Sequence, residues 1–315
     1  MNINIIARTN GVGLDQDVQL CSQLLTQWGY KVSKSHARGL SWWQRWIPGK
    51  PEYDINIFME RVFPAWTPFA KTNILIPNQE RFPKRQLRLL DQVQHIFCKT
   101  KHAENIFKRY HHSVFHTGFT SRDRIKSGVS MNYARWFHLA GRSTLKGTET
   151  IVDLWQEHPE WPKLTLVQNK QNAPRSVPEN IHLVTEYLSN EALHELQSSH
   201  GIHCCPSLSE GWGHHIVEGM SSGAVVITTD APPMNELVDP SRGYLVAHGR
   251  EEPRHLGTNF YVSKKALEKT IQKVIALDQS SLQEMGQKAR NWFTANNTAF
   301  AESMAESLHQ CIKVG

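Results

Sequence analysis

The sequence of 315 residues contains little cysteine and no long apolar run. Its cysteines form no CxxC pair and none stands beside a histidine at zinc-ligand spacing, so we expect no structural zinc. No apolar stretch approaches the roughly 18 residues that span a bilayer. A secretory signal is also missing, which predicts a cytoplasmic protein with reduced thiols and at most a peripheral membrane association. The five cysteines are Cys21, Cys98, Cys204, Cys205 and Cys311.

Acidic residues are scarce in the first part of the chain. Residues 1–126 hold 19 Lys and Arg against 9 Asp and Glu, a net charge of +10, whereas residues 127–315 hold 16 against 20, a net charge of −4. The total of +6 is therefore an average of two unlike parts. Such asymmetry predicts that the first part meets an anionic partner. An apolar content of 39% and this length predict two globular domains.

Strand-like and helix-like segments alternate along the chain, the pattern of parallel βαβ units. Two such series, separated by the polar segment 121–133, predict two Rossmann-like lobes in tandem. The expected strands lie at 2–8, 30–33, 53–60, 72–77, 94–98, 114–118, 136–140, 163–167, 181–184, 201–205 and 224–228. The expected helices lie near 15–28, 84–92, 102–110, 148–158, 190–198, 215–222 and 282–314.

The stretch from 206 to 230 carries the strongest chemical signal. A strand ends, a glycine loop follows, and a helix begins near His214. The backbone N–H groups and the positive end of such a helix form an anion site. Glu210 lies on the loop and Glu218 about two helical turns later, so the two carboxylates can accept hydroxyl hydrogen bonds from different parts of one elongated ligand.

These residues carry a resemblance to a known family. Glu210 and Glu218 match the E-x7-E pattern of retaining GT-B glycosyltransferases, and the surrounding EGWGHHIVEGMSSGAVVITTD resembles glycosyltransferase family 4, the group 1 set. The segment 137–147, with Arg142 and Lys146, resembles the GR…KG segment of that family. The resemblance covers residues 136–250 well and the N-terminal lobe in outline.

The resemblance implies an α/β GT-B fold, two tandem Rossmann-like domains with a cleft between them. Residues 1–126 would form the acceptor-binding domain and residues 130–290 the nucleotide-sugar-binding domain. The helix at 291–315 would return to the N-terminal domain.

The resemblance also implies roles in the donor site. Arg142 and Lys146 would hold the donor diphosphate, a role that suits two fixed cations facing a growing negative charge. Glu218 would accept hydrogen bonds from the ribose hydroxyls, and Glu210 would bind the donor sugar and the β-phosphate. These cations and the helix end can balance the diphosphate, so we expect no metal and no cofactor. Further donor-side candidates are Gly211, Trp212, Gly213, His214, His215, Val184 and Thr185.

Near the N-terminus, Gly11 and Gly13 precede two aspartates in a segment that resembles the glycine-rich acceptor-side loop of the family. Asp17 matches the position near the reacting centre, where it would act on the acceptor, and Asp15 is its rival. Both aspartates stand near a helix start, so capping is an equally good interpretation.

The remaining features of the first lobe concern the acceptor. Trp42 and Trp43 stand among cations and suit an anionic membrane surface or stacked nucleobases, although they can equally fold back on their own lobe. Two basic clusters, which can also be solvated surface, favour a polyanionic acceptor. Their candidates are Arg81, Lys84, Arg85 and Lys99. The strand tips Glu60, Asn78 and Glu80 should lie where ligands gather, with open roles.

The sequence therefore predicts a retaining hexosyl- or pentosyltransferase that uses a nucleotide diphosphate sugar. Its acceptor would be an anionic envelope glycolipid or polysaccharide precursor, or, alternatively, nucleic acid such as hydroxylated bases of phage DNA. A GT-B phosphorylase or epimerase is a further enzyme alternative. A non-catalytic protein that binds sugar nucleotides or polyanions is the alternative of another class, and no protein partner is predicted.

Overall fold

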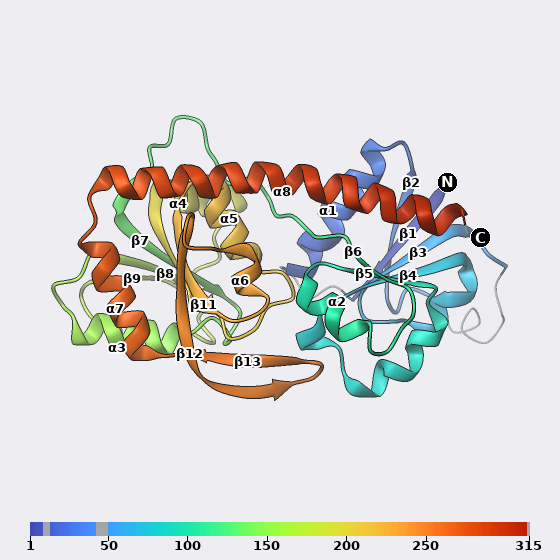
Figure 1. Cartoon of the computed structure of the whole chain (residues 1–315), viewed down its shortest axis with the longest axis horizontal. Coiled ribbons are helices and arrows are strands. Elements are labelled where there is room, and N and C mark those ends of the chain that lie inside the picture. The colour runs from blue at the N-terminus through green and yellow to red at the C-terminus, as the bar shows by residue number, and fades with distance from the viewer. Residues whose placement is uncertain (9–12, 42–49, 314–315) are drawn as a thin grey trace. The chain divides into compact units, whose positions relative to one another are not determined.

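The computed structural model describes residues 1–8, 13–41 and 50–313. The chain divides into two compact units (Figure 1). Unit 1 comprises Met1–Ser121, Arg254–Gly257 and Asn296–Gly315, and unit 2 comprises Arg122–Pro253 and Thr258–Ala295. Each unit contains a largely parallel sheet with helices, which confirms the predicted α/β fold of two Rossmann-like units.

Unit 1 has a six-stranded sheet in the order β2-β1-β3-β4-β5-β6, and all its pairings are parallel. Its strands are β1 Asn2–Ala7, β2 Lys31–His36, β3 Tyr53–Glu60, β4 Ala70–Pro77, β5 His95–Cys98 and β6 Val114–His116. Its helices are α1 Gly13–Gln27, α2 Lys101–Phe107 and the 3-10 helices η2 Pro64–Phe69, η3 Gln79–Arg81 and η4 Lys84–Gln92. The stretch expected to be helical at 84–92 is thus a 3-10 helix, and the first helix begins two residues earlier than expected.

Unit 2 has a seven-stranded sheet in the order β13-β12-β11-β10-β7-β8-β9. Its strands are β7 Asn132–Gly141, β8 Leu164–Gln168, β9 Ile181–Val184, β10 His200–Cys205, β11 Val225–Asp230, β12 Gly243–Arg254 and β13 Gly257–Val262. Its helices are α3 Thr148–Glu157, α4 Asn190–Ser199, α5 His214–Ser222, α6 Met234–Leu237 and α7 Lys264–Ile275. The helix α8 Gln279–Lys313 supplies residues to both units. None of the described helices is both long enough and apolar enough to cross a membrane.

The long β12–β13 hairpin, drawn in orange in Figure 1, and helix α7 lie outside the elements expected from the sequence. Most residues in the second half of β12 are exposed or half-buried, so this strand shows none of the alternating apolar pattern that marks a half-buried strand. Backbone pairing with neighbouring strands, rather than side-chain burial, defines it. The structure therefore adds two strands to the expected edge of the second sheet.

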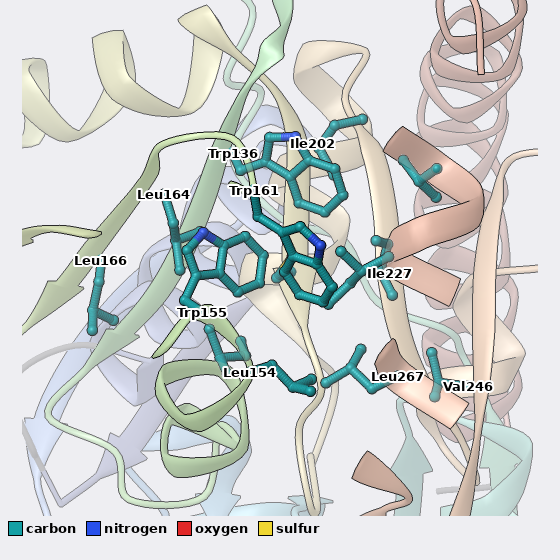
Figure 2. Close-up of a cluster of buried hydrophobic side chains, with 14 of the residues drawn as sticks. Trp136, Leu154, Trp155, Trp161, Leu164, Leu166, Ile202, Ile227, Val246 and Leu267 are labelled. Atoms are coloured by element: carbon teal, nitrogen blue, oxygen red, sulfur yellow. The ribbon is translucent and has the colours of Figure 1, made fainter. Parts of the chain in front are cut away.

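A tryptophan cluster fills the core of unit 2 (Figure 2). The rings of Trp136 and Trp155 lie 5.7 Å apart in an edge-to-face arrangement, and Trp161 meets Trp155 in the same way at 5.0 Å. Such contacts add to the hydrophobic gain from burying the rings. The cluster joins β7 and α3 to the strands beside them, which holds fixed the strand ends that carry the site residues.

Two buried histidines within this sheet are neutral. Burial, with a smaller contribution from the charge of Lys146, lowers the pKa of His138 to about 4. Burial also lowers the pKa of His203 to about 3, with the nearby His200 adding to the effect. The Nδ1–H of His138 donates to the Cys204 carbonyl at 2.7 Å, so its Nε2 accepts from the Thr148 hydroxyl at 3.0 Å.

We expect acid to destabilise unit 2 through these histidines. An unfolded histidine titrates near pH 6.5, so below that pH the unfolded chain binds protons that the folded chain does not. Each histidine should lower the free energy of unfolding by about 1.4 kcal/mol per pH unit between pH 6.5 and its folded pKa. Urea unfolding from pH 7 to 4.5 measures this slope. His203→Gln should reduce it, whereas the exposed His182→Gln should not, and equal slopes in both variants would contradict the assignment.

Candidate functional site

In unit 2, the loops after β7 and β10 pack closely at the start of α5. Gly147 has φ +71°, and a Cβ there would lie 2.4 Å from the carbonyl oxygen of Pro206, so only glycine allows this approach. Gly213, with φ +105°, directly precedes α5 and has no side chain to cap it. The predicted loop-to-helix turn is therefore present in the structure, and the N-terminal, positive end of α5 faces the loop.

Lys146 and Glu210, predicted from separate motifs, meet at this place. The Lys146 Nζ donates to Glu210 Oε1 at 2.5 Å and to His215 Nδ1 at 3.2 Å. Because a lysine ammonium only donates, Nδ1 of His215 must accept, and its Nε2–H then donates to the Ser207 hydroxyl at 3.0 Å. Burial, followed by the charge of Lys146, lowers the pKa of His215, which keeps the ring neutral.

Glu218, on the second turn of α5, is held by partners that the sequence did not suggest. Its Oε1 accepts from the Arg124 Nη2–H at 3.2 Å, and its Oε2 accepts from the Gln197 amide at 2.9 Å. The side chains of Glu218 and Arg124 are each 4% exposed. Arg124 falls within the segment expected to be a linker, which has no periodic pattern that would mark it.

The other donor-side candidates differ in exposure. Arg142 is exposed on the loop after β7, and His214 is half-buried. Trp212 is only 5% exposed and belongs to the core, so its ring lies in the protein interior. Val184 and Thr185 stand half-buried at the end of the edge strand β9. Gly211 is buried in the loop. Among the residues that the structure describes, no group of three or more His, Cys, Asp or Glu side chains is arranged to hold a metal ion.

Lys146→Ala should leave the Glu210 carboxylate without its cation in a site where the two side chains are 16% and 12% exposed. Removing one partner of a largely buried ion pair costs up to about 3–5 kcal/mol, and we expect a loss toward the lower end because the site is partly open. Thermal and urea unfolding measure the effect. The exposed Lys163→Ala in the same unit is the matched control. Equal stability of both variants would show that the ion pair contributes nothing.

In unit 1, Asp17 and Lys99 form a buried ion pair. The Lys99 Nζ lies 2.5 Å from Asp17 Oδ2, with side chains 2% and 4% exposed. Lys99 directly follows β5, and its ammonium also lies 4.6 Å above the centre of the Phe119 ring. Asp17 stands near the start of α1, whereas Asp15, two residues earlier, is half-buried and lines a hollow with Lys34 and His36. The structure thus separates the two aspartates, and Asp17 is the one at the strand ends.

Glu60 ends β3 in a strained conformation beside this pair. Its φ of +69° is unusual for a residue with a side chain. Burial raises the pKa of Glu60, the charges of Arg61, Arg81 and Lys99 oppose the rise, and Asp17 adds to it. Glu60 therefore lies within electrostatic reach of the Asp17–Lys99 pair. Strained residues of this kind gather at functional sites.

The basic candidates of unit 1 lie on its surface, except Lys99. The Arg81 side chain is 47% exposed, and Lys84 and Arg85 on η4 are also exposed. Gly13 is exposed at the first position of α1. Gly11, Trp42 and Trp43 lie outside the described residues.

Lys99→Met should destabilise unit 1 by about 3–5 kcal/mol, because it leaves the Asp17 charge buried without a cation. Asp17→Asn combined with Lys99→Met should recover most of that loss, since no uncompensated charge then stays inside. Urea unfolding of the two single variants and the double variant measures the coupling. Additive losses would contradict it.

Comparisons with known proteins agree with this architecture. Residues 173–292 match the family model described as glycosyl transferases group 1. Anabaena HepE, solved in complex with UDP and glucose, superposes with a TM-score of 0.72 at 15% identity, over 98% of this chain and 100% of that chain. The chain has the GT-B fold.

Two further solved structures share that fold. Sucrose-phosphate synthase from Thermosynechococcus elongatus superposes with a TM-score of 0.72 at 15% identity, over 100% of both chains. A glycosyltransferase from Rickettsia africae superposes with a TM-score of 0.72 at 11% identity, over 97% of both chains. A comparison with curated proteins gave no match. At these identities the likeness concerns the GT-B fold.

Proposed function

We propose that this GT-B protein is a retaining, metal-independent glycosyltransferase that moves a sugar from a nucleotide diphosphate sugar to an acceptor hydroxyl. The observation that carries the proposal is the ion pair of Lys146 and Glu210 at the start of α5, in which the Lys146 ammonium also lies 3.2 Å from Nδ1 of the buried His215. The match of residues 173–292 to group 1 glycosyl transferases supports it. HepE was solved with UDP and with UDP-glucose, so a UDP-sugar is the first donor to test.

The proposed donor site stabilises the departing diphosphate with fixed positive charge. Lys146, the exposed Arg142 and the positive end of α5 can face the phosphate oxygens as their negative charge grows. A diphosphate competes with Glu210 for the Lys146 ammonium. Release from that ion pair would leave the Glu210 carboxylate to accept hydrogen bonds from the sugar hydroxyls, while Glu218 accepts from the ribose.

In the proposed reaction, His215 stays neutral. Its imidazole fixes the direction of Lys146 by accepting at Nδ1, and Ser207 fixes the ring in turn. A cationic imidazole here would repel Lys146, which is why a lowered pKa suits the site. The leaving phosphate oxygen takes the acceptor proton on the face from which it departs, so the anomeric configuration is retained. Asp17, oriented by Lys99, then positions the acceptor hydroxyl rather than serving as an obligatory base.

The proposed acceptor is anionic, an envelope glycolipid or polysaccharide precursor. The excess of +10 in residues 1–126 and the exposed cations Arg81, Lys84 and Arg85 support this class. An acceptor of that kind would bring the protein to the cytoplasmic membrane face as a peripheral enzyme.

Transfer should depend on the proposed donor residues. We expect Glu210→Ala and Arg142→Ala each to lower the turnover of UDP-glucose by about 100-fold or more, since each removes an interaction that strengthens in the transition state. Release of UDP and transfer of labelled sugar measure the turnover, and NMR of the product gives the anomeric configuration. UDP-, GDP-, ADP- and dTDP-sugars are first ranked by the rise in Tm that a bound ligand causes.

Matched controls remove an exposed charge of the same sign from the same unit. Glu179→Ala and Arg175→Ala should leave turnover at the wild-type level. Full activity of the Glu210 and Arg142 variants would overturn the donor-site assignment. Binding of a sugar nucleotide without hydrolysis or transfer would instead favour a non-catalytic binding protein, and inversion of the anomeric configuration would overturn the retaining mechanism.

A further inference from the structure

The tip of the β12–β13 hairpin is anchored within unit 1, beside the residues that follow β4. The Leu256 N–H donates to the Gln79 carbonyl at 3.2 Å, and the Leu256 side chain packs against the hydrophobic core of that unit. A Cβ on Gly257 would lie 3.3 Å from the backbone of Glu80, so the absence of a side chain permits this close contact. These contacts fix the position of the two residues that precede Leu256, namely Arg254 and His255.

The anchored tip places Arg254 in the same unit as three arginines that follow β3 and β4, and all four lie within electrostatic reach of His255. Arg61 directly follows β3, whereas Arg81 and Arg85 lie on the 3-10 helices after β4. Partial burial, followed by the charges of Arg254, Arg61, Arg81 and Arg85, lowers the pKa of His255. All four arginines therefore act on one imidazole. We call these four residues the arginine cluster.

Carboxylates only partly balance this cluster. Glu60 Oε1 lies 3.2 Å from Arg61 Nε, and Glu80 Oε1 lies 3.9 Å from Arg81 Nε. The first contact has an ion-pair distance without hydrogen-bond geometry, so the buried Nε of Arg61 makes no hydrogen bond in the described structure. The Nε of Arg254 is also buried without a hydrogen-bond partner there. Buried donors of this kind are uncommon, since an unmet donor costs free energy.

Backbone strain marks the same place. Glu60 has φ +69° and His255 has φ +54°, and they are the two residues other than glycine with positive φ in the described chain. Glu60 directly precedes Arg61 in sequence, and His255 directly follows Arg254. Strain of this kind persists where surrounding structure enforces it, and it concentrates at ligand sites. Here it accompanies the two arginines whose Nε atoms are buried without acceptors.

We propose that Arg61, Arg81, Arg85 and Arg254 bind a phosphoryl group carried by the acceptor substrate. A guanidinium group presents a planar fork of donors that matches phosphate oxygens. The four positive charges of the cluster also exceed the two negative charges of Glu60 and Glu80. The inference deepens the proposed function, on which it rests, by naming the anionic group of the acceptor. The position of the cluster supports this proposal. Arg61 and Arg81 follow the carboxyl ends of β3 and β4, and parallel sheets bind ligands at these ends of their strands.

The position of Glu60 connects the two parts of this acceptor site. Besides burial, the charges of Arg61 and Arg81, and also those of Lys99 and Asp17, act on the pKa of its carboxyl group. Glu60 ends β3 and Lys99 follows β5, and both strands pair with β4, so the two parts share one edge of the sheet. An acceptor whose phosphoryl group lies on the arginine cluster can therefore present a hydroxyl group toward Asp17 along this edge. This arrangement suits a compact phosphorylated sugar or polyol, free or as a lipid headgroup.

Binding of defined probes tests the inference. Wild-type protein should bind glucose 6-phosphate in isothermal titration calorimetry at least about 10-fold more tightly than glucose, if the soluble source is correct. Vesicles of phosphatidylglycerol, compared with phosphatidylcholine, test the lipid source. Arg81→Ala and Arg254→Ala should each weaken the phosphate-dependent binding by about 10-fold or more. Arg254→Lys keeps the charge but loses the fork, so its loss should be intermediate.

Arg88→Ala is the matched control, because Arg88 is exposed on the same 3-10 helix as Arg85 but lies outside the cluster. Binding of UDP-glucose is measured in parallel with every variant. If the cluster variants keep that binding and lose only the phosphate probe, the inference holds. If no phosphate probe binds, or if Arg88→Ala weakens binding as much as Arg254→Ala, the inference is wrong even where donor turnover stands. If wild-type protein showed no turnover of any sugar nucleotide, the proposed function itself would be wrong.

Discussion

Parallel strands end at one edge of a sheet, and the polar residues that follow them must share that edge. In this protein the constraint acts once in each unit. It brings Asp17 to Lys99 across 82 residues of sequence and Lys146 to Glu210 across 64. The well-packed sheets fix where the strands end, so these side chains meet without any local sequence signal for their pairing. The candidate chemistry of both units depends on this geometry.

A charge taken out of water needs a partner, and this requirement explains how the candidate residues are held. Asp17, Glu210 and Glu218 each face a cation across a largely buried contact. Under the proposed function, the donor diphosphate replaces Glu210 as the partner of Lys146, and these two side chains are exposed enough, at 12% and 16%, for a ligand to reach them. The Asp17–Lys99 pair is more deeply buried and therefore suits a fixed, orienting role.

The arginine cluster differs from these pairs because cations outnumber their acidic neighbours. Four guanidinium groups face two carboxylates, and two Nε donors are buried without acceptors in the described structure. The bulk charge of +10 in residues 1–126 thus has a structural counterpart in unit 1. Arg254 comes from the other part of the sequence, where the net charge is −4. A charge count along the chain could not have placed it in the cluster.

The sequence by itself determined the alternating βαβ pattern, the two-unit α/β fold, and the loop-to-helix segment around Glu210. These features depend on local periodicity and on glycines whose conformation the turns require. Only the tertiary structure decided that Arg124 and Gln197 hold Glu218, that Asp17 rather than Asp15 pairs with Lys99, and that the tip of the β12–β13 hairpin places Arg254 in unit 1. The physical reason is that strand order and burial, rather than sequence spacing, choose the partners of a buried charge.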